Sequence, residues 1–167
     1  MVGKIEEYYA KYDAAASDPE LLETFWAEWG NTKRKACINM RAYDQYQECG
    51  YTEEPRFNEY GWLANDVEKS KAERVVLFGD GYTQSYVECL QLPNGKWIGG
   101  KHYMLAISGA SMGLSVWCKQ YDTRIECLTE QMRDVANAIK ASEKMSDKQH
   151  LAPVVKAMND IRQLSLF

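Results

Sequence analysis

The chain has 167 residues, a length that suits one domain with short appendages and leaves little room for a second. Its formal net charge of -4 and pI near 5.3 argue against the basic face that strong nucleic-acid binding requires, and the charge is too small for a strong DNA mimic. Five scattered cysteines without a Cys-x-x-Cys pair, no signal peptide and no long apolar run predict a cytoplasmic protein without disulfides, metal, cofactor or membrane contact.

Residues 1–50 are predicted to form a helical segment. Apolar residues recur at helical spacing in its first part. Asp18-Pro19 then has the pattern of an N-cap followed by proline at the first helical position, and an apolar stripe follows this start. A third helix is expected over about residues 32–48. Residues 51–72 mix proline, glycine and polar side chains, which indicates a connection.

After this connection the pattern changes to that of an antiparallel β-meander. β-Favouring residues alternate with turn sequences, of which Asp80-Gly81 is the strongest. Gly99 and Gly100 fall inside an expected strand and indicate a bulge or a close approach of another element. Residues 108–113 are expected to form a loop. The four predicted strands are residues 74–78, 82–92, 96–107 and 114–121.

Thr123 and Glu126 have the spacing of a capping box at the start of a long helix, whose apolar stripe is expected to cover one face of the sheet. Residues 143–167 are predicted to hold a short helix that begins near Pro153, followed by a tail. The chain is therefore predicted to have an α+β fold. Its sheet and long helix, at residues 73–142, are expected to form one domain with the N-terminal helices.

The last five residues read Gln163-Leu164-Ser165-Leu166-Phe167. Their apolar side chains, and a glutamine that offers a directional hydrogen bond, suit insertion of an extended peptide into a preformed hydrophobic pocket. The peptide resembles the one with which bacterial replication and repair proteins bind the β sliding clamp. The resemblance covers only these residues, and it implies a partner at replicating or repaired DNA and no fold. The alternative is a final helical turn that packs these side chains into the core.

Two patterns bear on catalysis and metal binding. Residues 109–113 match the Gly-x-Ser-x-Gly nucleophile elbow of hydrolases, with Ser111 as the nucleophile and His150 after it in the required order. An elbow passes from a strand directly into a helix, whereas the following residues are predicted to form a strand, so Ser111 is expected in an ordinary hairpin loop. His102 and His150 lie on different predicted elements, so no metal site is expected.

Two features could contact nucleic acid. Lys33-Arg34-Lys35 is a basic cluster that could touch phosphate, although such a cluster is more often the solvated face of a helix. Aromatic residues are frequent in the predicted sheet, where they could stack unpaired bases or fill the core. These aromatic residues are Tyr82, Tyr86, Trp97, Tyr103, Trp117 and Tyr121.

Together the patterns favour a non-enzymatic accessory protein of a phage or mobile element. It is expected to dock on the bacterial β sliding clamp through residues 163–167 and to contact DNA weakly or indirectly. An alternative is an anti-defence inhibitor, such as an anti-CRISPR or anti-restriction protein, that blocks a defence nuclease by protein–protein contact through an acidic helical face or the aromatic sheet. A third hypothesis is a small serine hydrolase that uses Ser111 and His150.

Overall fold

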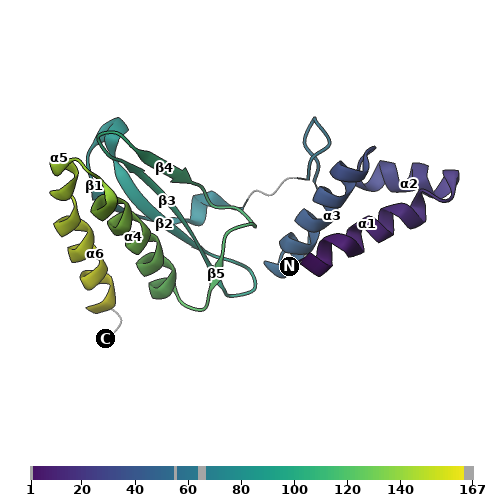
Figure 1. The fold of residues 1–167 in the computed structure, drawn as a ribbon. Coiled ribbons are helices and arrows are strands. Elements are labelled where there is room, and N and C mark those ends of the chain that lie inside the picture. The colour runs from purple at the N-terminus through teal and green to yellow at the C-terminus, as the bar shows by residue number, and fades with distance from the viewer. Residues whose placement is uncertain (1, 55, 64–66, 164–167) are drawn as a thin grey trace. The chain divides into compact units, whose positions relative to one another are not determined.

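The computed structural model of the chain describes residues 2–54, 56–63 and 67–163, with side chains from residue 5 onward. It has the predicted α+β fold, with N-terminal helices, an antiparallel sheet, a long helix on the sheet and a short C-terminal helix (Figure 1). The chain divides into two compact units, residues 1–65 and 66–167. The boundary between the units falls within the predicted connection.

The first unit is mainly helical up to residue 48, and the described residues after it include an isolated β-bridge between Phe57 and Leu63. Its helices are α1 (Val2–Ala15), α2 (Pro19–Trp29) and α3 (Lys33–Glu48). Asp18 caps α2 as predicted, because its carboxylate accepts a hydrogen bond from the Glu20 backbone N–H at 3.0 Å. The hydroxyl of Thr32 caps α3 in the same way, by accepting from the backbone N–H of Lys35 at 3.2 Å. Local capping therefore explains where both helices begin.

The buried core of this unit is small. α2, which the structure describes in full, contributes no buried residue to it. A buried amide, Asn39, holds the segment after α3, since it donates to the backbone oxygen of Gly61 at 3.0 Å and accepts from the N–H of Leu63 at 2.9 Å. One cluster consists of Tyr8, Cys37 and Met40, with Phe25 and Trp29 partly buried against them.

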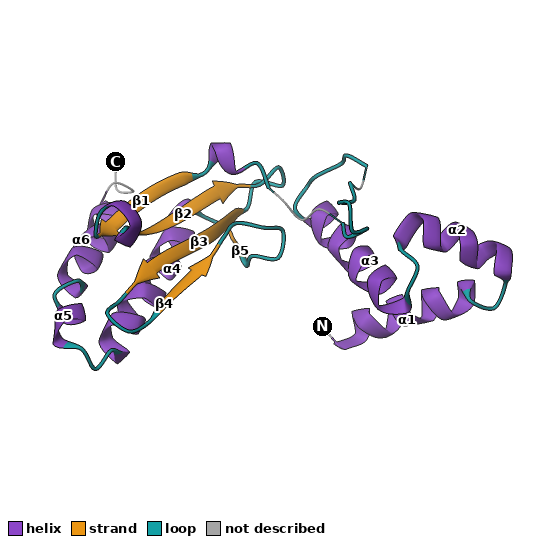
Figure 2. Ribbon diagram, turned by 90° about the horizontal axis from the view of Figure 1, so that it is seen from above, coloured by secondary structure: helices purple, strands orange, loops and turns teal. Residues whose placement is uncertain are grey.

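The second unit is built on an antiparallel sheet with the strand order β1-β2-β3-β4, and β5 also pairs with β3 (Figure 2). The predicted turn at Asp80-Gly81 lies between β1 and β2, and the turn at residues 93–95 lies between β2 and β3. The strands are β1 (Glu73–Phe78), β2 (Ser85–Gln91), β3 (Trp97–Met104), β4 (Gly109–Met112) and β5 (Gln120–Tyr121).

The prediction of a continuous strand over residues 114–121 is wrong. β4 instead lies within residues 108–113, where the sequence predicts a loop. Because β2 occupies one edge of β3, β4 and β5 share the other edge, and residues 113–119 leave the sheet between them. Leu114 and Val116 are buried in this excursion, so their alternation reflects burial outside a strand.

The helices of the second unit are α4 (Arg124–Ala141), α5 (Met145–Lys148) and α6 (Leu151–Gln163). α4 covers one face of the sheet as predicted, and α6 packs beside α4 and against β1 (Figures 1 and 2). Both hydrogen bonds of the predicted capping box between Thr123 and Glu126 are present at the start of α4. The long amphipathic helix is thus fixed at its start by local chemistry and along its length by the sheet.

Gly99 explains how α4 comes so close to the sheet. A β-carbon at this position would lie 2.7 Å from Cγ of Gln131 and 2.8 Å from Sγ of Cys127, both on α4. The pairing of β2 with β3 is continuous through Gly99. The sequence predicts a bulge or a close approach of another element at this glycine pair, and the close approach is observed.

The core of the second unit lies between the sheet and its helices. Burial raises the pKa of the Cys89 and Cys127 thiols to about 12, so both stay protonated at neutral pH. Within the described residues, no helix is long and apolar enough to cross a membrane. Core residues include Leu77, Val87, Cys89, Leu128, Met132, Val135, Ile139, Val154 and Ile161.

Candidate functional site

The clamp-like peptide begins in the last described turn of α6. Gln163 is the last described residue of this helix and is exposed, whereas residues 164–167 lie outside the described part of the chain. α6 is anchored because Val154 and Ile161 are buried in the core that the helix shares with α4 and β1. The first residue of the motif is therefore held at the surface of a folded unit.

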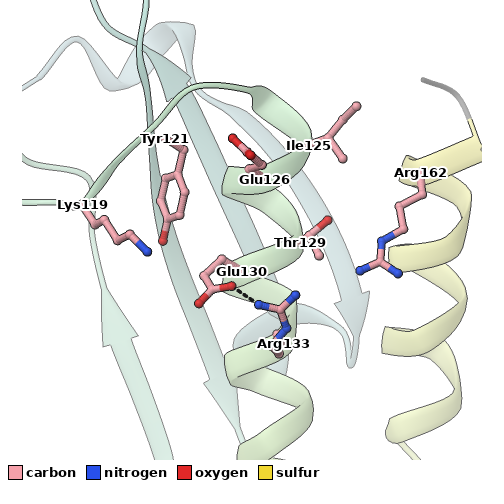
Figure 3. A pocket seen from close by; sticks show the side chains of 8 residues that line it. All are labelled: Lys119, Tyr121, Ile125, Glu126, Thr129, Glu130, Arg133 and Arg162. Carbon is pink, nitrogen blue, oxygen red and sulfur yellow. Dashed lines mark hydrogen bonds and ion pairs between the residues drawn. The ribbon is translucent and has the colours of Figure 1, made fainter. Parts of the chain in front are cut away.

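A pocket of about 390 Å³ opens beside the same end of α6 (Figure 3). The side chains that α4 contributes to the pocket lie between β5 on one side and Arg162 of α6 on the other. Three of the lining side chains are cationic and two are carboxylates, which gives the lining a formal net charge of +1 (three minus two). The charged residues are Lys119, Arg133, Arg162, Glu126 and Glu130.

Both carboxylates of the pocket are engaged within the chain. Glu130 forms an ion pair with Arg133, three residues along α4. Glu126 accepts the capping-box hydrogen bond from the backbone N–H of Thr123 at 3.2 Å. On the opposite wall, Nζ of Lys119, an exposed residue, lies 4.9 Å from the centroid of the Tyr121 ring in a cation–π contact. The lining therefore carries a formal net charge of +1 on an acidic chain.

The remaining walls of the pocket are formed by Tyr121, Ile125 and Thr129. Tyr121 is half-buried, and this burial raises the pKa of its phenol, which accepts a hydrogen bond from the Gln131 amide at 3.3 Å. Thr129 is 7% exposed, and its hydroxyl has no hydrogen-bond partner within the described residues. The pocket forms only where α6 packs on α4, so no local sequence signal could have indicated it.

Two of the three residues of the basic cluster are used within the first unit. Nζ of Lys33 donates to both carboxylate oxygens of Asp13, at 2.6 and 2.8 Å. Nζ of Lys35 donates to the backbone oxygen of Tyr60 at 2.9 Å. Arg34 is exposed. These contacts favour the interpretation of the cluster as a helix surface that holds neighbouring segments.

Ser111 lies on β4 and His150 packs against β1, and these strands stand at opposite ends of the strand order. Ser111 is exposed on β4, opposite His102 of β3, and not in the predicted loop. His150 stacks on Phe78 of β1, with ring centroids 4.2 Å apart. Since β2 and β3 separate β1 from β4, the structure does not bring the two hydrolase candidates together. Ser111 also lies on a strand and not at a strand-to-helix turn.

The sheet face opposite α4 carries a row of stacked side chains. The guanidinium carbon of Arg74 lies 3.8 Å from the centroid of the Tyr86 ring, and the rings of Tyr86 and His102 are stacked with centroids 5.3 Å apart. The row follows from the register of β1, β2 and β3, which composition alone does not reveal. Other predicted sheet aromatics pack against the core: Trp97, Tyr103 and Tyr121.

α2 presents an acidic and apolar surface. Leu21 is 57% exposed and Trp26 is 37% exposed, and the charged residues of the helix are all glutamates. Leu21 also lines a second pocket of about 330 Å³, together with Phe25 and Glu28. Exposed apolar side chains among carboxylates are typical of a surface that binds a basic partner.

Within the described residues, no group of three or more histidine, cysteine, aspartate or glutamate side chains is arranged to hold a metal ion. Comparisons of the chain with protein-family models, with curated proteins and with solved structures find no match. Its function must therefore be inferred from its own residues.

Proposed function

We propose that the chain is a non-enzymatic accessory protein of a phage or mobile element that docks on the bacterial β sliding clamp through residues 163–167. The observation that supports this most is the exposure of Gln163 on an anchored helix. The motif is thereby joined directly to a folded unit, while its first side chain stays available for a partner. The folded chain is then brought to replicating or repaired DNA by the clamp.

The chemistry of the motif supports the same proposal. Burying a leucine or phenylalanine side chain in a partner contributes about 1.5–3 kcal/mol, so Leu164, Leu166 and Phe167 can supply most of the affinity of a short peptide. Direct DNA contact is weak in this account, because the chain carries a net charge of -4 and two of its three clustered cations are engaged internally.

Binding of the purified chain to a purified β sliding clamp tests the proposal. Truncation after Arg162 should abolish binding, and Leu166→Ala/Phe167→Ala should weaken it at least about 30-fold, since two anchor side chains are lost. Val155→Ala is the matched control, because Val155 is exposed on the same helix outside the motif. Undiminished binding by the truncated chain would refute the proposal.

α2 favours a second candidate function, the inhibition of a defence nuclease. Its exposed apolar residues and its glutamates would fit a basic, DNA-binding surface of such an enzyme. A nuclease-inhibition assay separates the two candidates. An inhibitor that acts through α2 should lose activity with Leu21→Ser/Trp26→Ser and keep it after truncation at Arg162. The clamp proposal predicts that neither the intact chain nor the truncated chain inhibits the nuclease.

A further inference from the structure

We infer that the pocket beside α6 is a second contact with the clamp, and that it takes an acidic strip of the clamp surface next to the groove that holds the peptide. This inference rests on the proposed function. Arg162 lines the pocket, and Gln163, the next residue, begins the motif. Since consecutive Cα atoms lie about 3.8 Å apart, a partner that holds Gln163 comes close to Arg162 at the rim of the pocket.

Charge identifies the chemistry of the strip. The chain is acidic overall, with a net charge of -4, whereas the lining of the pocket carries +1. Arg133 keeps half of its side chain exposed despite its ion pair with Glu130, and Lys119 is exposed above Tyr121. A cationic rim at the point of contact lets an acidic chain approach carboxylates that the rest of its surface would repel.

The walls of the pocket suit a protein surface. Tyr121 and Ile125 are half-buried, so each still offers apolar area that a partner can cover. The cations surround this apolar centre, as in an interface with a charged rim. α2, which also has exposed apolar residues, is acidic and would repel the same strip. The pocket therefore fits an acidic partner better than α2 does.

The test compares the clamp affinity of the intact chain with that of a synthetic peptide of residues 158–167, by titration calorimetry at low and high salt. The intact chain should bind about fivefold tighter at low salt, and this advantage should shrink at high salt, because a second contact adds charge pairs to the peptide. Lys119→Gln/Arg133→Gln should remove most of the advantage while leaving the peptide contact intact.

A matched control removes the same two charges elsewhere. The variant Lys140→Gln/Lys144→Gln removes the charges of two exposed lysines that do not line the pocket. It should bind the clamp like the unmodified chain. Lys119→Gln alone gives a second variant outside the helices, with a smaller loss expected. Circular dichroism confirms that each variant is folded.

The outcomes separate the inference from the proposed function. Equal affinity of peptide and intact chain, or a Lys119→Gln/Arg133→Gln variant that binds as well as or better than the unmodified chain, overturns the second contact and leaves the motif as the docking element. Absence of binding by both the peptide and the intact chain overturns the proposed function itself.

Discussion

Thr129 buries a hydroxyl that has no hydrogen-bond partner among the described residues. An unsatisfied buried hydroxyl costs stability, and valine has nearly the same shape. Thr129→Val should therefore raise the free energy of unfolding by about 1 kcal/mol. Urea denaturation of the two chains measures this difference. A lower stability of the variant would show that the hydroxyl has a stabilising partner in solution.

Asp147 is a buried carboxylate whose partners control its titration. The Ser142 hydroxyl and the Ala106 backbone N–H, the latter at 2.9 Å, donate to it and hold the pKa of this carboxyl below the usual aspartate value of about 4. Because the folded pKa is below the unfolded one, the ionised group stabilises the fold above about pH 4. This contribution is lost as the pH falls through the folded pKa.

Asp147→Asn should accordingly lower the urea midpoint at neutral pH, and the difference from the unmodified chain should narrow in acid. The measurement is a series of urea unfolding curves from neutral pH to about pH 2.5 for both chains. Midpoints that differ by the same amount at every pH would contradict the assigned hydrogen bonds.

At the scale of elements, the packing of α4 on the sheet depends on Gly99. Gly99→Ala should destabilise the chain by about 1–3 kcal/mol, because the added methyl group would overlap Gln131 and Cys127. Gly113→Ala is the matched control, since a β-carbon there meets no atom within 4 Å. Chemical unfolding of both variants checks the prediction. Equal stability of the two variants would mean that α4 can shift away from the sheet without cost.

Elements whose limits are set by neighbouring residues could be predicted from the sequence. Asp18 and Thr123 cap their helices through side-chain hydrogen bonds within three residues, so the pattern is sufficient. The division of the last strand into β4 and β5 could not be predicted in this way. Leu114 and Val116 alternate as in a strand, and only the pairing with β3 shows that this segment leaves the sheet.

At the scale of the whole molecule, the sequence predicts the candidate motif but not the pocket beside it. Residues 163–167 are contiguous, so their chemistry can be recognised without a fold. The pocket combines Lys119, the first turns of α4 and Arg162, which meet only through tertiary packing.

The most direct test of clamp docking is a competition measurement. The intact chain, carrying a fluorescent label, is bound to a purified β sliding clamp, and the unlabelled peptide of residues 158–167 is added as competitor. Docking through the motif predicts that the peptide displaces the chain completely, and that the same peptide with Leu166→Ala/Phe167→Ala does not. A chain that fails to bind, or that stays bound at saturating peptide, would contradict clamp docking through residues 163–167.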